Sequence, residues 1–103
     1  MQNNWDYQVV AISTGKPYSQ VEEDDYFVRE FSESVDPMEL VWHRDREDRE
    51  VTILEGSGWK LQMDNEQPRE LIKGKTYRIP AMEYHRIIKG KDNLLLQIKE
   101  KVK

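Results

Sequence analysis

The sequence predicts an all-β domain, an antiparallel barrel or sandwich built from short strands. Apolar and polar residues alternate with a period of two along most of the chain, which is the pattern of strands with one buried face. Segments rich in Gly, Pro, Asn, Asp and Ser separate these stretches and favour turns. No long stretch has a helical period, so helices are not expected to form the core.

Each predicted strand is short and contains β-branched or aromatic residues. The strands are YQVVAI at 7–12, YFVREF at 26–31, MELVWH at 38–43, EVTIL at 50–54, GWKLQMD at 58–64, TYRIP at 76–80, YHRII at 84–88 and NLLLQIK at 93–99. The acidic segment 19–25 is expected to form one helical turn or a loop. Short strands at this regular spacing are typical of antiparallel barrels.

The composition indicates a single domain with a well-solvated surface. The 103 residues include 16 basic and 20 acidic side chains, which are interspersed and give a net charge of -4. This balance argues against nucleic acid or an anionic membrane as a partner. The chain has no cysteine, which excludes disulfides and thiolate metal ligands. It also lacks an apolar run of transmembrane length and a signal-peptide pattern, so we expect a cytoplasmic location.

Strand parity indicates which side chains face the interior, because alternate residues of a strand face opposite sides of the sheet. In segment 41–45 the odd-numbered residues share one face. The other expected interior residues are Val51, Ile53, Trp59, Leu61, Met63, Tyr77, Ile79, His85, Ile87, Leu94, Leu96 and Ile98. The pattern predicts a barrel with an apolar floor and a polar cluster at one end.

Two histidines and one carboxylate form the candidate metal site. His43 and Asp45 share one strand face, His85 lies at an inward position of another strand, and the chain has no other histidine. Two imidazoles and a carboxylate leave open positions on Fe(II) and also suit Zn or Mn. The alternative is a metal-free barrel with hydrogen-bonded structural histidines, in which Asp45 pairs with Arg49 at the barrel mouth.

A second question is which of two neighbouring residues, Arg49 or Glu50, faces the barrel interior, because they lie on opposite sides of one strand. Val51 and Ile53 are good interior residues, so parity turns Arg49 into the barrel mouth and Glu50 toward solvent. A bulge at the start of this strand would reverse the two and make Glu50 a fourth metal ligand.

These residues resemble the two sequence motifs of the cupin superfamily. Gly74, Pro80 and His85 have the spacing of the second motif, in which Met82 replaces a glycine and Lys89 an asparagine. The first motif departs further from the pattern.

In the first motif, Pro37 stands at the opening glycine and Asp45 replaces the second histidine. Counting back from Gly56 puts Arg49, rather than Glu50, at the glutamate position. The likeness covers about residues 38–99.

The resemblance implies one cupin domain over residues 1–103, a double-stranded β-helix or jelly-roll barrel, with motif 1 at about 38–58 and motif 2 at about 74–89. It also implies small-molecule binding, with a divalent Fe, Mn, Zn or Ni ion in the barrel mouth. The alternative is a metal-dependent dioxygenase, isomerase or lyase acting on a small anionic substrate. In either case Arg49 would pair with a ligand carboxylate. By their residue types Trp59, Met63 and Tyr77 are more typical of the core, and those nearest the open end would give a ligand a stacking surface.

We also expect a homodimer. Parity places Trp42 and Leu40 on the outer face of the barrel, where they would form an apolar patch that a lone monomer exposes. The segments before Val35 exceed a minimal barrel and could extend the sheets across a two-fold axis.

Overall fold

The computed structural model describes residues 16–101. The strand predicted at 7–12 lies outside the described residues. Within them, the secondary structure consists of strands and one short 3-10 helix. The elements are β1 (Ser19–Glu22), β2 (Phe27–Phe31), η1 (Pro37–Glu39), β3 (Asp48–Glu55), β4 (Lys60–Met63), β5 (Arg69–Glu70), β6 (Thr76–Ile79), β7 (His85–Ile88) and β8 (Leu94–Lys101). No helix in this part of the chain is long and apolar enough to cross a membrane.

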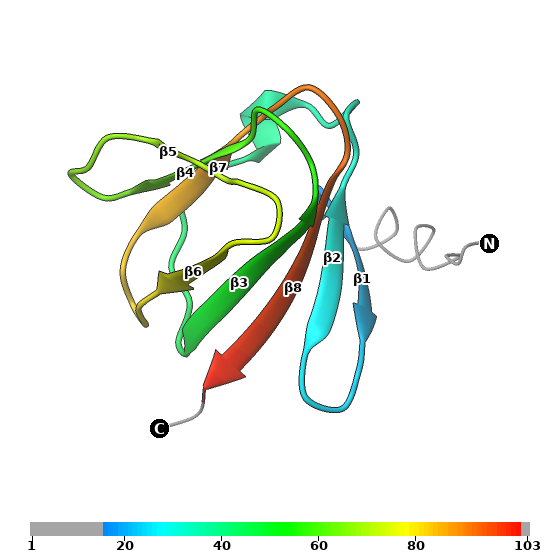
Figure 1. The fold of residues 1–103 in the computed structure, drawn as a ribbon. Helices are drawn as coiled ribbons and strands as arrows, with labels where there is room; N and C mark the ends of the chain where they lie inside the picture. The colour runs from blue at the N-terminus through cyan, green and yellow to red at the C-terminus, as the bar shows by residue number, and fades with distance from the viewer. Residues whose placement is uncertain (1–15, 102–103) are drawn as a thin grey trace.

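The strands form two antiparallel sheets (Figure 1). The larger sheet has the order β1-β2-β8-β3-β6, and the smaller has the order β5-β4-β7. Apolar side chains from both sheets make one core, in which Trp59 is fully buried and its ring lies 6.0 Å from that of Phe31. The predicted all-β fold is therefore confirmed.

Most of the predicted interior residues are buried, because the strand registers preserve the expected parity. Tyr77 and Ile87 are only partly buried, whereas Phe27, Phe31 and Leu71 join the core in addition. Val41, which is 60% exposed, and His43 are exposed as well. Their segment does not form the strand on which the parity argument depended.

The strand predicted at 38–43 is wrong. Pro37 occupies the first turn of η1, and the side chain of Asp36 accepts a hydrogen bond from the Met38 amide. This combination of a proline and an aspartate cap favours a helical start over a strand. After the turn, His43 makes a single isolated bridge to His85.

The helical turn or loop expected at 19–25 is also wrong. Residues 19–22 form β1, which pairs with β2 from Ser19 opposite Glu30 to Glu22 opposite Phe27. Pairing with a neighbouring strand satisfies the backbone of this polar segment, and its sequence alone does not reveal that neighbour. The short strand β5 was not predicted either.

Candidate metal-binding site

The two histidines are held together by their backbones. The His43 amide donates to the His85 carbonyl at 3.0 Å, and the His85 amide donates to the His43 carbonyl at 2.9 Å. Their rings meet edge to face, with centroids 4.4 Å apart. One ligand atom from each of His43, Asp45 and His85 lies within 4.8 Å of the other two, so the three predicted residues converge.

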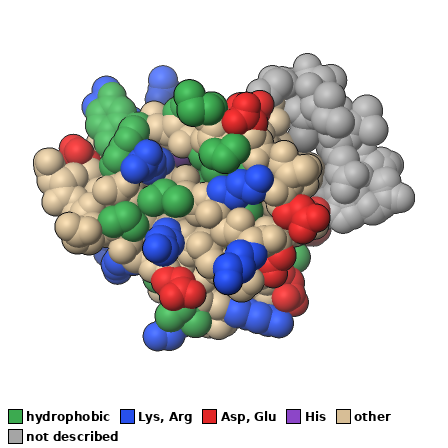
Figure 2. All heavy atoms as spheres, turned by 90° about the horizontal axis from the view of Figure 1, so that it is seen from above, with side chains coloured by type: hydrophobic (Ala, Val, Ile, Leu, Met, Phe, Trp, Pro, Cys, Tyr) green, Lys and Arg blue, Asp and Glu red, His purple; other side chains and the backbone are tan. Residues whose placement is uncertain are grey.

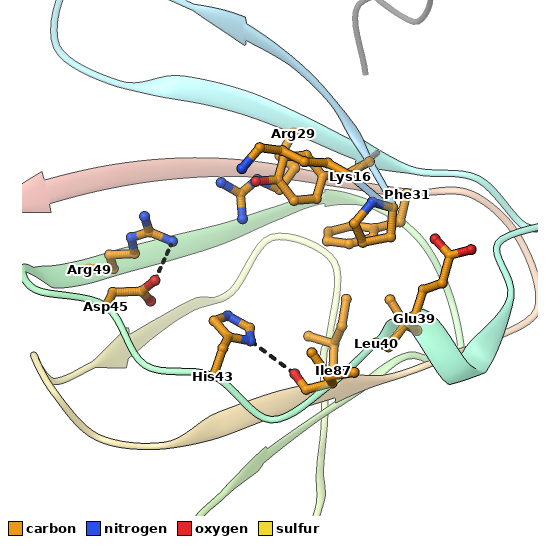
Figure 3. Close-up of a pocket in the computed structure, with 12 residues that line it drawn as sticks. Lys16, Arg29, Phe31, Glu39, Leu40, His43, Asp45, Arg49 and Ile87 are labelled. Carbon is orange, nitrogen blue, oxygen red and sulfur yellow. Dashed lines mark hydrogen bonds and ion pairs between the residues drawn. The ribbon is translucent and has the colours of Figure 1, made fainter. Parts of the chain in front are cut away.

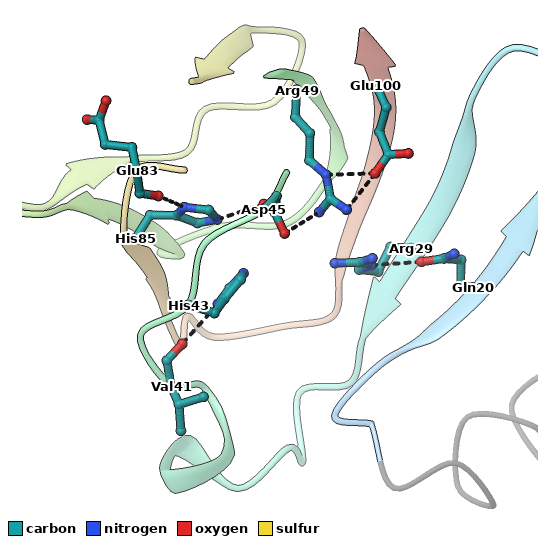
Figure 4. Close-up of polar contacts among 9 residues, drawn as sticks. All are labelled: Gln20, Arg29, Val41, His43, Asp45, Arg49, Glu83, His85 and Glu100. Atoms are coloured by element: carbon teal, nitrogen blue, oxygen red, sulfur yellow. Dashed lines mark hydrogen bonds and ion pairs between the residues drawn. The ribbon is translucent and has the colours of Figure 1, made fainter. Parts of the chain in front are cut away.

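Both imidazoles have the same tautomer when they are neutral, because a backbone carbonyl can only accept a hydrogen bond. Nδ1 of His43 lies 3.0 Å from the Val41 carbonyl oxygen, and Nδ1 of His85 lies 2.9 Å from that of Glu83 (Figure 4). Each Nδ1 therefore carries the proton and leaves Nε2 with its lone pair. Such a backbone bond is the usual way in which a metal-binding histidine is oriented.

Asp45 completes the group from the segment that leads into β3. Its carbonyl accepts a hydrogen bond from the Met82 amide at 2.7 Å, which ties the segment to the turn before β7. Its Oδ1 lies 3.4 Å from Nη1 of Arg49. Its Oδ2 is buried, lies 3.3 Å from Nε2 of His85 and has no hydrogen-bond partner.

Arg49 faces the barrel mouth, but its charge is largely matched. Its Nη2 donates to Oε2 of Glu100 at 2.6 Å, and its Nε donates to the same oxygen at 3.0 Å. Its contact with Asp45 then places Oδ1 toward the guanidinium and leaves Oδ2 toward the histidines. Arg49 thus orients the Asp45 carboxylate, and Glu100 offsets the repulsion that the guanidinium would exert on a cation.

The electrostatics favour the charge states that a metal requires. Burial lowers the pKa of His43 below its ordinary value, and this favours the neutral ring. Burial alone would raise the pKa of the Asp45 carboxyl, but its charged surroundings, among them the guanidinium of Arg49, outweigh it and hold that pKa below its usual value. A neutral imidazole and an ionised carboxylate are the ligand forms of these groups.

The structure does not bring Glu50 to this group. Glu50 lies on the opposite face of β3 from Arg49, and its Oε2 lies 2.9 Å from Nζ of Lys101. The register irregularity of β3 falls between Ile53 and Glu55, at the far end of the strand, so it does not turn Glu50 inward.

The three residues expected to line the ligand site lie in different places. Trp59 is a core residue whose Nε1 donates to the Asp92 carbonyl at 2.7 Å. Met63 is buried opposite His85 in the β4–β7 register. Tyr77 borders an inner apolar cavity, and its hydroxyl is engaged by two backbone groups, the Ile72 amide and the Glu70 carbonyl.

A cavity of about 370 Å³ opens beside His43 (Figure 3). Besides His43, Asp45 and Arg49 it is lined by Lys16, Pro17, Tyr18, Arg29, Phe31, Glu39, Leu40, Val41 and Ile87. Sequence reasoning did not identify Arg29 as a site residue. The available signal was its position between Phe27 and Phe31, which puts a guanidinium on the buried face of β2.

Comparisons with known proteins identify the fold. No protein-family model matches the chain, and no curated protein sequence matches it significantly. A cupin-2 domain containing protein from Shewanella frigidimarina is similar in structure, with 25% identity and a TM-score of 0.56 over 76% of this chain and 72% of that one. A chain from crystal structures of DMSP lyases has 18% identity and a TM-score of 0.65 over 75% of this chain and 37% of that one.

A third similar structure carries iron. The Fe(II) form of HppE has 16% identity and a TM-score of 0.60 over 82% of this chain and 48% of that one. The present chain therefore spans less than half of the HppE and DMSP lyase chains that it matches. Together the topology and these neighbours show the cupin fold, and the His43/Asp45/His85 group within it could hold a metal ion.

Proposed function

We propose that this protein binds a divalent transition metal through Nε2 of His43, Oδ2 of Asp45 and Nε2 of His85, and that the ion helps to hold a small molecule in the adjoining cavity. The metal would act as a Lewis acid toward an oxygen of that molecule. The chain's own residues orient the three ligands and line the cavity.

The observation that carries this proposal is the contact between Asp45 and His85. In the neutral tautomer of His85, Nε2 and Oδ2 are two acceptors facing each other at 3.3 Å, and Oδ2 is buried without a donor. Two lone pairs at this separation repel each other unless a cation or a proton lies between them. Ligands about 2.1 Å from one tetrahedral ion are themselves about 3.4 Å apart, which matches the spacing.

Binding is favoured over catalysis by the positions of two titratable residues, Tyr77 and Glu50. The Tyr77 hydroxyl is engaged by backbone groups, and Glu50 is paired with Lys101 outside the cavity. Neither is placed to transfer a proton to a molecule held at the His43/Asp45/His85 group.

The test is elemental analysis and metal titration of the protein without an affinity tag, together with Asp45→Asn. We expect about one ion per chain in the wild type and a loss of affinity of more than about 100-fold in the variant, since even outer-sphere partners contribute about 10–100-fold. Asp64→Asn changes an exposed aspartate and serves as the matched control.

Thermal unfolding of the metal-free proteins distinguishes a metal site from the alternative, in which Asp45 and a protonated His85 form a structural ion pair. An asparagine amide can donate to the lone pair on Nε2 of His85, so Asp45→Asn should cost the metal-free fold no more than the contact with Arg49, about 1 kcal/mol. A loss of about 3 kcal/mol or more, with no metal bound by the wild type, would instead indicate a protonated His85 paired with Asp45.

A further inference from the structure

We infer that the ligand of this cavity is a small carboxylate, and that Arg29 is the residue that recognises its carboxylate group. Arg49, the residue expected from the sequence, is already engaged by Glu100 and Asp45. The inference rests on the proposed function only for the ligand's second contact, which would be made at the metal.

Arg29 is a cation in an apolar part of the barrel. It lies on β2 between the buried side chains of Phe27 and Phe31, and β2 is paired on both sides, with β1 and with β8. Placing a guanidinium on an inner sheet face costs free energy unless its charge is matched. Burial lowers the pKa of Arg29 to about 10, which still leaves it positively charged at neutral pH.

The structure supplies little to match this charge. Nε of Arg29 donates to Oε1 of Gln20 at 3.0 Å, and the guanidinium carbon lies 3.8 Å from the centre of the Tyr18 ring. No ion pair joins Arg29 to a carboxylate in the part of the chain that the structure describes. The Nη groups border the cavity and point toward the space beside His43 and Arg49 (Figure 4).

The shape of the site favours a planar anion with an apolar body. Tyr18 covers one face of the guanidinium, so a ligand meets its edge, where two parallel N–H groups match a carboxylate. Phe31, Leu40 and Ile87 form an apolar wall along one side of the space between Arg29 and His43 (Figure 3). A volume of about 370 Å³ is at the lower end of the range for small-molecule sites.

The experiment measures binding of succinate and glutarate by calorimetry, with and without added Mn(II) or Zn(II). The neutral diamides serve as ligand controls and inorganic phosphate as a competing anion. We expect dicarboxylate binding in the wild type, strengthened by the metal. Arg29→Gln should weaken it by about 10- to 100-fold, as expected for a lost charged hydrogen-bond pair.

Arg86→Gln is the matched control variant. Arg86 also donates from Nε to a cross-strand glutamine, Gln62, and also lies over an aromatic ring, that of Trp42, but it does not line the cavity. Its affinity for the dicarboxylates should equal that of the wild type. Arg29→Lys keeps the positive charge and can be compared with the wild type if Arg29→Gln does not fold. Its affinity for the dicarboxylates should lie between those of Arg29→Gln and the wild type.

The outcomes separate this inference from the metal proposal. Metal binding with equal dicarboxylate affinity in the wild type and in the folded Arg29 variants would overturn the role of Arg29 and leave the metal proposal standing. Dicarboxylate binding that depends on Arg29, without any metal binding, would overturn the metal proposal and leave the role of Arg29 standing. Failure of the wild type to bind either dicarboxylate at high millimolar concentration, or tighter binding of phosphate, would also overturn the inference.

Discussion

Met82 has a backbone conformation that favours glycine. Its φ is 65°, and it stands at a position where the cupin second motif has glycine. A residue with a side chain pays about 1–2 kcal/mol to adopt this left-handed backbone conformation. Glycine avoids this cost, but part of the gain is offset because glycine gives more freedom to the unfolded chain. The Met82 amide donates to the Asp45 carbonyl, so this turn also helps to position the His43/Asp45/His85 group.

We therefore expect Met82→Gly to raise the free energy of unfolding by about 0.5–1 kcal/mol. The Met82 side chain is 50% exposed, so little packing is lost. Chemical denaturation measures the change, and Met82→Ala, which retains Cβ, should give no such gain. An equal gain in both variants would assign the effect to the exposed side chain rather than to the backbone.

The sequence was sufficient to find His43, Asp45 and His85, but it was insufficient to find Arg29. The first three lie close to motif positions. His85 is on a strand, where alternation indicates which residues face inward, whereas His43 and Asp45 converge with it although their segment forms no strand. Arg29 becomes a cavity residue because β2 packs beside β8 and because Tyr18 covers its guanidinium, and both contacts join segments whose pairing the alternation does not specify. Its single visible signal was a charge between two phenylalanines.

At the scale of elements, the strands that alternate most regularly were predicted to within a few residues. The errors lie in segment 37–43 and in β1, where local capping in one case and pairing with a neighbour in the other determine the structure. His43 reached its predicted place without a strand around it, because the bridge to His85 fixes it there.

Gly90 lies just after the end of β7, at a point where the backbone passes close to Trp59. A Cβ at this position would lie 2.4 Å from both the Ser57 carbonyl oxygen and Cδ1 of Trp59. Gly90→Ala should therefore destabilise the fold by about 3 kcal/mol, at the upper end for overpacking, because the backbone must move. Denaturant unfolding measures the loss.

Gly74→Ala is the matched control. A Cβ added at Gly74 contacts nothing within 4 Å, so the only cost of this substitution is the backbone strain of a side chain at a φ of +89°. Its loss should be near 1 kcal/mol. Equal losses in the two variants would contradict the steric explanation for Gly90.

At the scale of the whole molecule, we expect a homodimer, although the apolar patch differs from the one anticipated. Leu40 packs against the core, whereas Met38, Val41 and Trp42 are exposed at 82%, 60% and 41%. Figure 2 shows hydrophobic side chains interspersed with basic ones over one end of the molecule. Exposed apolar side chains that gather at one end of a molecule favour association.

Light scattering at micromolar concentration should give a mass near twice 12.4 kDa. Val41→Ser combined with Trp42→Ser should shift the mass toward the monomer and leave the fold intact, while Ile72→Ser, which removes another exposed apolar residue, should not. A monomeric wild type would show that this patch does not mediate self-association.

The mutual backbone bonds of His43 and His85 would connect the proposed metal binding to local unfolding. Neither ring can move far from the other unless the two amides release each other's carbonyls. An ion held by both rings would oppose this opening, and mass action would make the opposition grow with the free ion concentration. Hydrogen exchange at these two amides would then slow as the ion concentration rises. The strength of the junction between residue 43 and β7 would depend on the supply of metal as well as on the amino-acid sequence.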